Sequence, residues 1–381
     1  MKRQGWLILV IVLAGIVSPL RAVAEWSPAK QTEARALLEL ILRPNGGSAP
    51  AVAPAISYAV AIDGDLVWSG GLGEIAPGRL ADENTVYRIG SLTKQFTAAG
   101  ILRLIDDKAQ SRLTGNFLSI EAPASDFLEG VEGWKVKGQA PITLHSLLNM
   151  TSNLQNYTRR PPKGLDPWGT ITSRELLSAL KSYRPSGWPN SFEYSNTSYF
   201  LLAEIASASR LPGSDAPIEF RPYMKEALFA PAGMTSTGFS GDPALEARVP
   251  LASYRQRPVF SHPDWLKGSA DMLSTVADFY RWNSALMEGR ILSAESRELM
   301  FSESARITPT TFYGMGWFIV PHDDRVHFSH TGSVAGFTSC NTIARSRDRS
   351  HWLSVTLLSN ADGVEGLEQL ADDLVELIER K

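Results

Sequence analysis

Segments that favour β-strands lie at both ends of the chain, and segments that favour helices fill its middle. Near the N-terminus, residues 56–62 and 66–71 are rich in strand formers and flank Asp63-Gly64-Asp65, a strong hairpin signal. Further strands are predicted at residues 314–320, 326–329, 337–344 and 352–359. We therefore expect an antiparallel sheet that is built from both chain ends.

Apolar residues at helical spacing predict the helices that accompany this sheet. They cover residues 31–42, 91–106, 277–287 and 365–378, and in the middle of the chain residues 143–150, 173–182 and 198–208. The sequence thus predicts an α/β (α+β) fold with an antiparallel sheet flanked by helices. We assign residues 25–115 and 242–381 to this sheet domain, and residues 116–241 to a mainly helical inserted domain.

The first 24 residues have the pattern of a secretory signal peptide. Lys2-Arg3 precede an apolar run over residues 6–17, and Ala22-Val23-Ala24 fits a cleavage site before Glu25. The apolar run is shorter than the roughly 20 residues that a membrane-spanning helix needs. We expect export to the periplasm or medium, with no stable membrane insertion after cleavage; an uncleaved anchor is the alternative.

Composition excludes several classes of function. The formal net charge is −3 and no basic stripe is present, which argues against nucleic acid as a partner. The one cysteine, Cys340, has no partner for an internal disulfide, and its apolar strand-like context predicts a buried thiol. No His-Glu-x-x-His sequence occurs, and His327 and His330 are predicted on opposite faces of a strand. We therefore expect no metal and no other cofactor.

Ser91-Leu92-Thr93-Lys94 supplies a nucleophile and a base at the start of an apolar helix. Residues three apart share a helix face, so the Lys94 amine can approach the Ser91 hydroxyl. Burial in this helix disfavours the ammonium form, which would lower the pKa of Lys94 and let it act as a base. The plain alternative is that Ser91 only caps the helix.

Spacing alone does not single out this serine. The same pattern occurs at Ser27-Pro28-Ala29-Lys30 and at Ser178-Ala179-Leu180-Lys181. Only Ser91 follows a glycine and precedes an apolar helix.

Two further motifs come after Ser91 in order: Tyr194-Ser195-Asn196, ahead of a predicted helix, and His330-Thr331-Gly332-Ser333 at the end of a predicted strand. Read singly, Tyr194 could be a packed aromatic, Asn196 a helix cap and His330 a strand histidine.

Taken together, these motifs resemble those of penicillin-recognising serine enzymes. Tyr-x-Asn followed by Lys/His-Thr-Gly is similar to class C β-lactamases, D-alanyl-D-alanine carboxypeptidases of the serine type and family VIII esterases. The resemblance extends to residues 142–152 and 313–317 and so covers nearly the whole chain after residue 24.

The resemblance implies a role for each motif residue. Ser91 would be the acylated nucleophile, Lys94 its partner and Tyr194 the second proton-transfer group. The substrate-binding residues would be Asn196, His330, Thr331, Gly332 and Ser333. The backbone N–H groups of Ser91 and Ser333 would form the oxyanion hole.

His330 stands where β-lactamases of this group usually have lysine. An imidazole is largely neutral at pH 7, so we expect weaker or pH-dependent binding of a substrate carboxylate. The sequence therefore predicts an exported serine hydrolase that acts on an ester or on a D-amino-acid amide or peptide. The alternatives are a class C-like β-lactamase and, from another class, a non-catalytic module that binds peptidoglycan or a protein.

Overall fold

The computed structural model describes residues 26–42, 54–134, 141–167, 169–186, 188, 190–252, 263–334, 336–361, 364 and 366–380. The predicted signal peptide, residues 1–24, lies outside these residues. Within them, no helix combines the length and the hydropathy that a membrane span requires.

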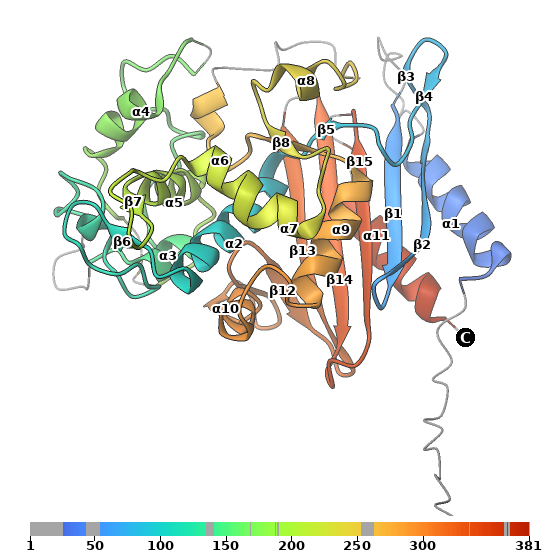
Figure 1. The fold of residues 1–381 in the computed structure, drawn as a ribbon. Coiled ribbons are helices and arrows are strands. Elements are labelled where there is room, and N and C mark those ends of the chain that lie inside the picture. Colours follow the sequence, from blue (N-terminus) through green and yellow to red (C-terminus); the bar gives the residue numbers. More distant parts are fainter. Residues whose placement is uncertain are drawn as a thin grey trace, which may run out of the picture.

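One large antiparallel sheet dominates the described part of the chain (Figure 1). Its eight strands follow the order β10-β11-β12-β13-β14-β15-β1-β2. The strands are β1 (Ile56–Ile62), β2 (Asp65–Leu72), β10 (Ala305–Arg306), β11 (Phe312–Tyr313), β12 (Phe318–Pro321), β13 (Arg325–Val334), β14 (Phe337–Ser346) and β15 (Trp352–Ser359). The predicted fold class is therefore confirmed: the sheet is antiparallel and comes from both ends of the chain.

The pairing of β1 with β15 joins the two chain ends. Its register runs from Ile56 opposite Ser359 to Ile62 opposite Leu353. On its other edge β1 forms the predicted hairpin with β2, and the turn places Asp63 and Gly64 at φ angles of 51° and 94°. Two positive φ values in succession are typical of the tight turn that an Asp-Gly pair favours.

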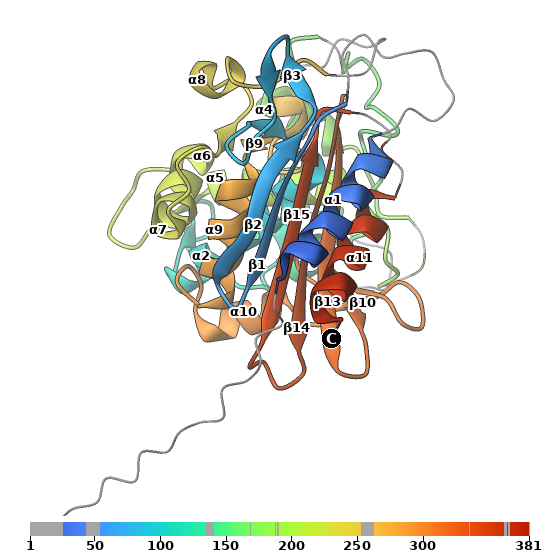
Figure 2. The same ribbon diagram turned by 90° about the vertical axis from the view of Figure 1, so that its right-hand side faces the viewer.

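Helices cover both faces of the sheet (Figures 1 and 2). Helices α1 (Pro28–Ile41) and α11 (Leu367–Glu379) pack on one face, with α11 over β14 and β15. Helix α9 (Val276–Met287) packs on the other face against β1 and β15, and α2 (Thr93–Asp106) lies on that side between the sheet and the helical region. The sheet thus separates two hydrophobic cores.

The middle of the chain contributes most of the remaining helices. They are α3 (Leu144–Leu148), α4 (Ser173–Leu180), α5 (Asn196–Ser207), α6 (Phe220–Met224), η3 (Lys225–Phe229) and α7 (Ala230–Ala232). The other elements are β3 (Glu74–Ala76), β4 (Arg79–Leu80), β5 (Tyr87–Arg88), η1 (Gly90–Leu92), β6 (Gln110–Ser111), η2 (Ala124–Asp126), β7 (Ser209–Arg210), β8 (Gly238–Phe239), α8 (Pro243–Glu246), η4 (Pro263–Leu266), β9 (Met272–Ser274) and α10 (Ala294–Met300). The division into domains at residues 115/116 and 241/242 stays a prediction.

Two strand predictions need correction. Residues 314–320 are not one strand, because the chain turns between β11 and β12 at Gly316, whose φ is 86°. A Cβ atom at Gly316 would lie 2.9 Å from the carbonyl oxygen of Lys94, so this turn abuts the start of α2. Strand β13 is also longer than predicted: it runs to Val334, so the motif that starts at His330 forms the C-terminal part of the strand itself.

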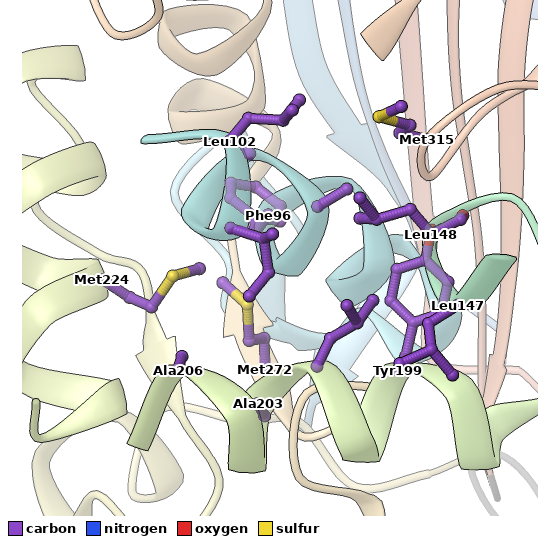
Figure 3. Packing of buried hydrophobic residues seen from close by; sticks show 14 of the residues in the cluster. Phe96, Leu102, Leu147, Leu148, Tyr199, Ala203, Ala206, Met224, Met272 and Met315 are labelled. Carbon is purple, nitrogen blue, oxygen red and sulfur yellow. The ribbon is translucent and has the colours of Figure 1, made fainter. Parts of the chain in front are cut away.

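Helix α2 is enclosed on almost every side. Eleven of its fourteen residues are buried, including Lys94. Phe96 packs against Trp282 with ring centroids 4.1 Å apart, and residues of α3, α5 and α6 close around the helix (Figure 3). At Gly100, an added Cβ atom would lie 2.4 Å from the sulfur of Met224. This packing fixes the helix that begins at the predicted nucleophile.

Candidate active site

Ser91 lies on the single 3-10 turn η1 that leads into α2. Gly90 precedes it with φ 52°, and the Ile89 N–H group donates to the Met272 carbonyl oxygen at 3.1 Å. Ser91 remains partly exposed, whereas its neighbours Gly90 and Leu92 are buried. The turn therefore presents one hydroxyl group to the surface from an otherwise buried segment.

Lys94 is completely buried and its ammonium nitrogen has three polar neighbours. Its Nζ atom lies 2.9 Å from Ser91 Oγ, 2.7 Å from Asn196 Oδ1 and 2.8 Å from the Ser269 carbonyl oxygen. Burial lowers the pKa of Lys94 well below its ordinary value, because an enclosed ammonium loses its hydration.

These contacts define how a neutral Lys94 is oriented. Asn196 Oδ1 and the Ser269 carbonyl can only accept hydrogen bonds, so they take both N–H groups of a neutral amine. The remaining lone pair then faces the Ser91 hydroxyl. This is the arrangement that a base needs to remove the proton of an attacking serine.

Tyr194 and Asn196 reach the same place from the helical region, at the start of α5. Asn196 accepts from Lys94 and donates its Nδ2 to Thr158 Oγ1 at 2.8 Å, and its side chain makes no capping bond to the helix. The Tyr194 ring centroid lies 4.9 Å from Lys94 Nζ. Burial raises the pKa of Tyr194, while a hydrogen bond with Ser91 and the charge of Arg159 act in the opposite direction. Tyr194 is therefore a neutral phenol at pH 7.

His330, on β13, is 1% exposed and both of its ring nitrogens have protein partners. Nδ1 lies 2.6 Å from the Thr331 carbonyl oxygen, and Nε2 lies 3.3 Å from the Tyr313 hydroxyl. Since the carbonyl only accepts, Nδ1 carries the proton and Nε2 accepts from Tyr313. Burial and the charge of Lys94 lower the pKa of His330 to about 3, so the imidazole is neutral at physiological pH.

Gly332 and Ser333 bring β13 against the turn that carries Ser91, the predicted nucleophile. A Cβ atom at Gly332 would lie 2.1 Å from the Ile89 carbonyl oxygen, and one at Gly90 would lie 2.9 Å from the Ser333 nitrogen. Backbone contact this close is possible only between glycines and main chain. The Ser333 nitrogen is thereby placed beside η1, where an oxyanion hole with Ser91 requires it.

The site also uses groups that carry no sequence signal. The Ser269 carbonyl contacts Lys94 from a turn in which the Gly268 N–H donates to Asp271 Oδ1 at 3.0 Å. Tyr313 belongs to the region of similarity at residues 313–317 but to none of the three motifs, yet its hydroxyl meets His330. A backbone carbonyl of an ordinary serine cannot be recognised from sequence.

The two other Ser-x-x-Lys sequences lie elsewhere. Ser27 caps α1, and the amine of Lys30 donates to the Ile378 carbonyl oxygen at 2.8 Å. Ser178 is exposed on α4.

Cys340 is buried in β14, as predicted. Within the described ranges, no group of three or more His, Cys, Asp and Glu side chains could hold a metal ion.

A family model described as Beta-lactamase matches residues 47–379. The chain belongs to this family. Penicillin-binding protein 4* of Bacillus subtilis (strain 168) is 26% identical over 301 residues, which cover 72% of this chain and 62% of that protein. The D-alanyl-D-alanine-carboxypeptidase/endopeptidase AmpH of Escherichia coli (strain K12) is 25% identical over 321 residues, or 78% of each chain.

Solved structures share the fold. The D-amino acid amidase from Ochrobactrum anthropi SV3 superposes with a TM-score of 0.67 at 21% identity, covering 91% of this chain and 98% of the amidase. The sheet and helices described above are thus those of the β-lactamase/transpeptidase-like fold. The protein is a serine hydrolase of the Beta-lactamase family.

Proposed function

We propose that the protein hydrolyses an ester, or a D-amino-acid amide or peptide, through an acyl-enzyme on Ser91. The observation that carries this proposal is the environment of Lys94. Its buried amine faces Ser91 Oγ at 2.9 Å, while Asn196 and the Ser269 carbonyl hold its other side. A non-catalytic binding module would have no use for a lysine whose ammonium form is disfavoured by burial.

In this mechanism Ser91 Oγ attacks the substrate carbonyl while its proton passes to Lys94 Nζ. The resulting oxyanion accepts hydrogen bonds from the N–H groups of Ser91 and Ser333. Tyr194 gives its phenolic proton to the leaving group and regains one from Lys94. Water then attacks the acyl-enzyme, transferring its proton by the same groups, and releases the acid and free Ser91.

The neutral state of His330 favours esters and amides over β-lactams. A β-lactam antibiotic carries a carboxylate, and its recognition at this strand would need a cation. The imidazole has a pKa of about 3, and its Nε2 already accepts from Tyr313. We therefore expect a β-lactam to acylate Ser91 slowly, and the class C-like β-lactamase is the second candidate that the same experiment tests.

Intact-mass spectrometry separates these activities. The protein is incubated with benzylpenicillin and, separately, with 4-nitrophenyl butyrate, and both the adduct and the released product are followed. A lasting penicillin adduct with rapid ester turnover supports the proposal, whereas rapid penicillin hydrolysis without an adduct supports a β-lactamase. Ser91→Ala should abolish acylation. Ser178→Ala, which changes another Ser-x-x-Lys sequence, should retain acylation. Full activity of Ser91→Ala would refute the mechanism.

We also propose that the protein is exported to the periplasm or the medium. The support is the pattern of residues 1–24, with a basic start, a short apolar run and a small-residue cleavage site. N-terminal sequencing of the protein from its natural host should begin at Glu25. A chain that retains residues 1–24 would instead support a membrane anchor.

A further inference from the structure

Charge is distributed unevenly around the Ser91 site. On the β13 side a pocket of ≈ 520 Å³ is lined by motif residues such as Thr331 and Ser333 and by the first turns of α11. Its charged lining residues, in the part of the chain that the structure describes, are Glu368 and Asp372. Neither forms an ion pair with a lysine or arginine among the described residues: Glu368 accepts from Ser329 Oγ at 3.2 Å, and Asp372 lies 3.4 Å from His327 Nδ1.

An anionic group of a substrate is therefore disfavoured on this side. The two carboxylates repel it, and no lysine or arginine lines the described part of this pocket to offset them. Substrates that carry a carboxylate must bind it elsewhere in the cleft or be excluded.

The turn at residues 156–160 lies on the helical side of the site, next to Asn196. The N–H groups of Arg159 and Arg160 both donate to the Asn156 carbonyl oxygen at 3.1 Å, and Asn156 Oδ1 accepts from the hydroxyl of Thr158 at 2.9 Å. The Thr158 hydroxyl oxygen in turn accepts from Nδ2 of Asn196. The turn is thus tied directly to the residue that holds Lys94.

Arg159 is the charged residue of this turn that acts on the site. Its side chain is exposed, and no carboxylate among the described residues lies within ion-pair distance of it. Arg159 directly follows Thr158, which contacts Asn196, and its positive charge lowers the pKa of Tyr194, the proposed proton donor. The neighbouring Arg160 is also exposed but has no such influence on Tyr194. A guanidinium can bind a carboxylate through two parallel hydrogen bonds.

We propose that Arg159 forms an anion-binding subsite of the Ser91 cleft, so that the enzyme prefers esters or amides that carry a carboxylate on the part of the substrate lying against residues 156–160. This inference rests on the proposed function, because it concerns the substrate of the same site. Attraction by Arg159 on the helical side of the site and repulsion by the acidic pocket on the β13 side would together orient a charged substrate at Ser91.

Two matched pairs of esters test the subsite. In the first, the acyl group carries the charge: the 4-nitrophenyl monoester of adipic acid is compared with its methyl ester. In the second, the leaving group carries it: the butyrate ester of 4-hydroxybenzoate is compared with that of methyl 4-hydroxybenzoate. We expect the wild-type protein to prefer the carboxylate in one pair, with a preference that falls as sodium chloride is added.

Variants of the turn identify the residue. Arg159→Gln should reduce the ratio of kcat/KM between the charged and the methylated ester by about tenfold, mainly through KM, as expected for one charge-assisted contact at a partly exposed site. Arg159→Lys should keep part of the preference. Arg160→Gln removes the same charge from the next residue of the turn and should leave the ratio unchanged.

Three results would overturn the inference. The first is that the wild-type protein prefers the methyl ester in both pairs. The second is that Arg159→Gln lowers kcat/KM equally for the charged and the methylated ester of a pair. The third is that Arg160→Gln loses the preference for the charged ester as fully as Arg159→Gln does. Failure of the proposed function would look different, because the wild-type protein would then hydrolyse none of the four esters and form no adduct on Ser91.

Discussion

Gly332 lies against the backbone of Ile89, and a Cβ atom at residue 332 would come within 2.1 Å of the Ile89 carbonyl oxygen. The same oxygen accepts a hydrogen bond from Ser339 Oγ at 2.8 Å. Strand β13 and the segment before the nucleophile are therefore in main-chain contact. Any side chain at residue 332 would push apart the two elements that form the proposed oxyanion hole.

Gly332→Ala should consequently weaken both folding and acylation. Overpacking against a backbone that cannot move aside lowers the free energy of unfolding, by about 2 kcal/mol here. Urea unfolding and the rate of acylation by 4-nitrophenyl butyrate measure the two effects. Gly133→Ala is the control, because the nearest atom to an added Cβ atom there lies at an ordinary 3.6 Å. Wild-type stability in Gly332→Ala would show that the contact is not rigid.

Asn196→Asp should displace the pH dependence of acylation to higher pH. An aspartate beside Lys94 Nζ would favour the ammonium form and raise the pKa of Lys94, so the neutral base would be available only at higher pH. At a fixed pH below that pKa, the neutral fraction of Lys94 falls about tenfold for each unit by which the pKa rises. The acylation rate falls by the same factor. The measurement is the pH profile of kcat/KM for a neutral ester.

Asn153→Asp provides the control for this displacement. Asn153 is buried, and its side chain donates to the Trp188 carbonyl oxygen, with no hydrogen bond to Lys94. The low-pH part of the kcat/KM profile of Asn153→Asp should coincide with that of the wild-type protein. If the low-pH part of the profile were unchanged in Asn196→Asp, the group whose deprotonation it reflects would not be Lys94.

Tyr194→Phe should lower kcat far more than it raises KM. The substitution removes the proposed proton donor to the leaving group but keeps the ring, and general acid catalysis contributes about 10² to 10⁴-fold. Tyr199→Phe is a matched control: its ring centroid lies 5.7 Å from Lys94 Nζ, and its hydroxyl donates to the Leu148 carbonyl oxygen, away from Ser91. Equal losses in both variants would contradict a role of Tyr194 in proton transfer.

His330→Gln should change how stability depends on pH. The pKa of His330 is about 3 in the folded protein and near 6.5 in the unfolded chain, so between these values only the unfolded state binds the proton. The free energy of unfolding therefore falls with decreasing pH by about 1.4 kcal/mol per pH unit in this window. Without the imidazole, this part of the slope should disappear.

Urea unfolding at several pH values between about 4 and 7.5 measures this slope. If His330→Gln retained the wild-type slope, the buried imidazole would not be the group that titrates. Acylation in the wild-type protein should likewise show no inflection from His330 between about pH 5 and 8.

Local sequence patterns sufficed for much of the fold. The hairpin at Asp63-Gly64, the strand at residues 352–359 and the helix that starts after Ser91 all followed from turn chemistry and apolar periodicity. Such patterns involve residues only a few positions apart, so they can be recognised in the sequence alone. The break at Gly316 escaped prediction, because a glycine within an apolar run gives no sign of which backbone it will abut.

For the site, the sequence by itself determined the motif residues and the order in which they occur. The tertiary structure alone decided that Asn196 and the Ser269 carbonyl orient the Lys94 amine, that His330 is buried and neutral, and that the charge of Arg159 acts on Tyr194. The physical reason is that hydration and charge at each group depend on atoms that are distant along the chain: Ser269 is 175 residues from Lys94. Burial and contact arise only when such segments pack together.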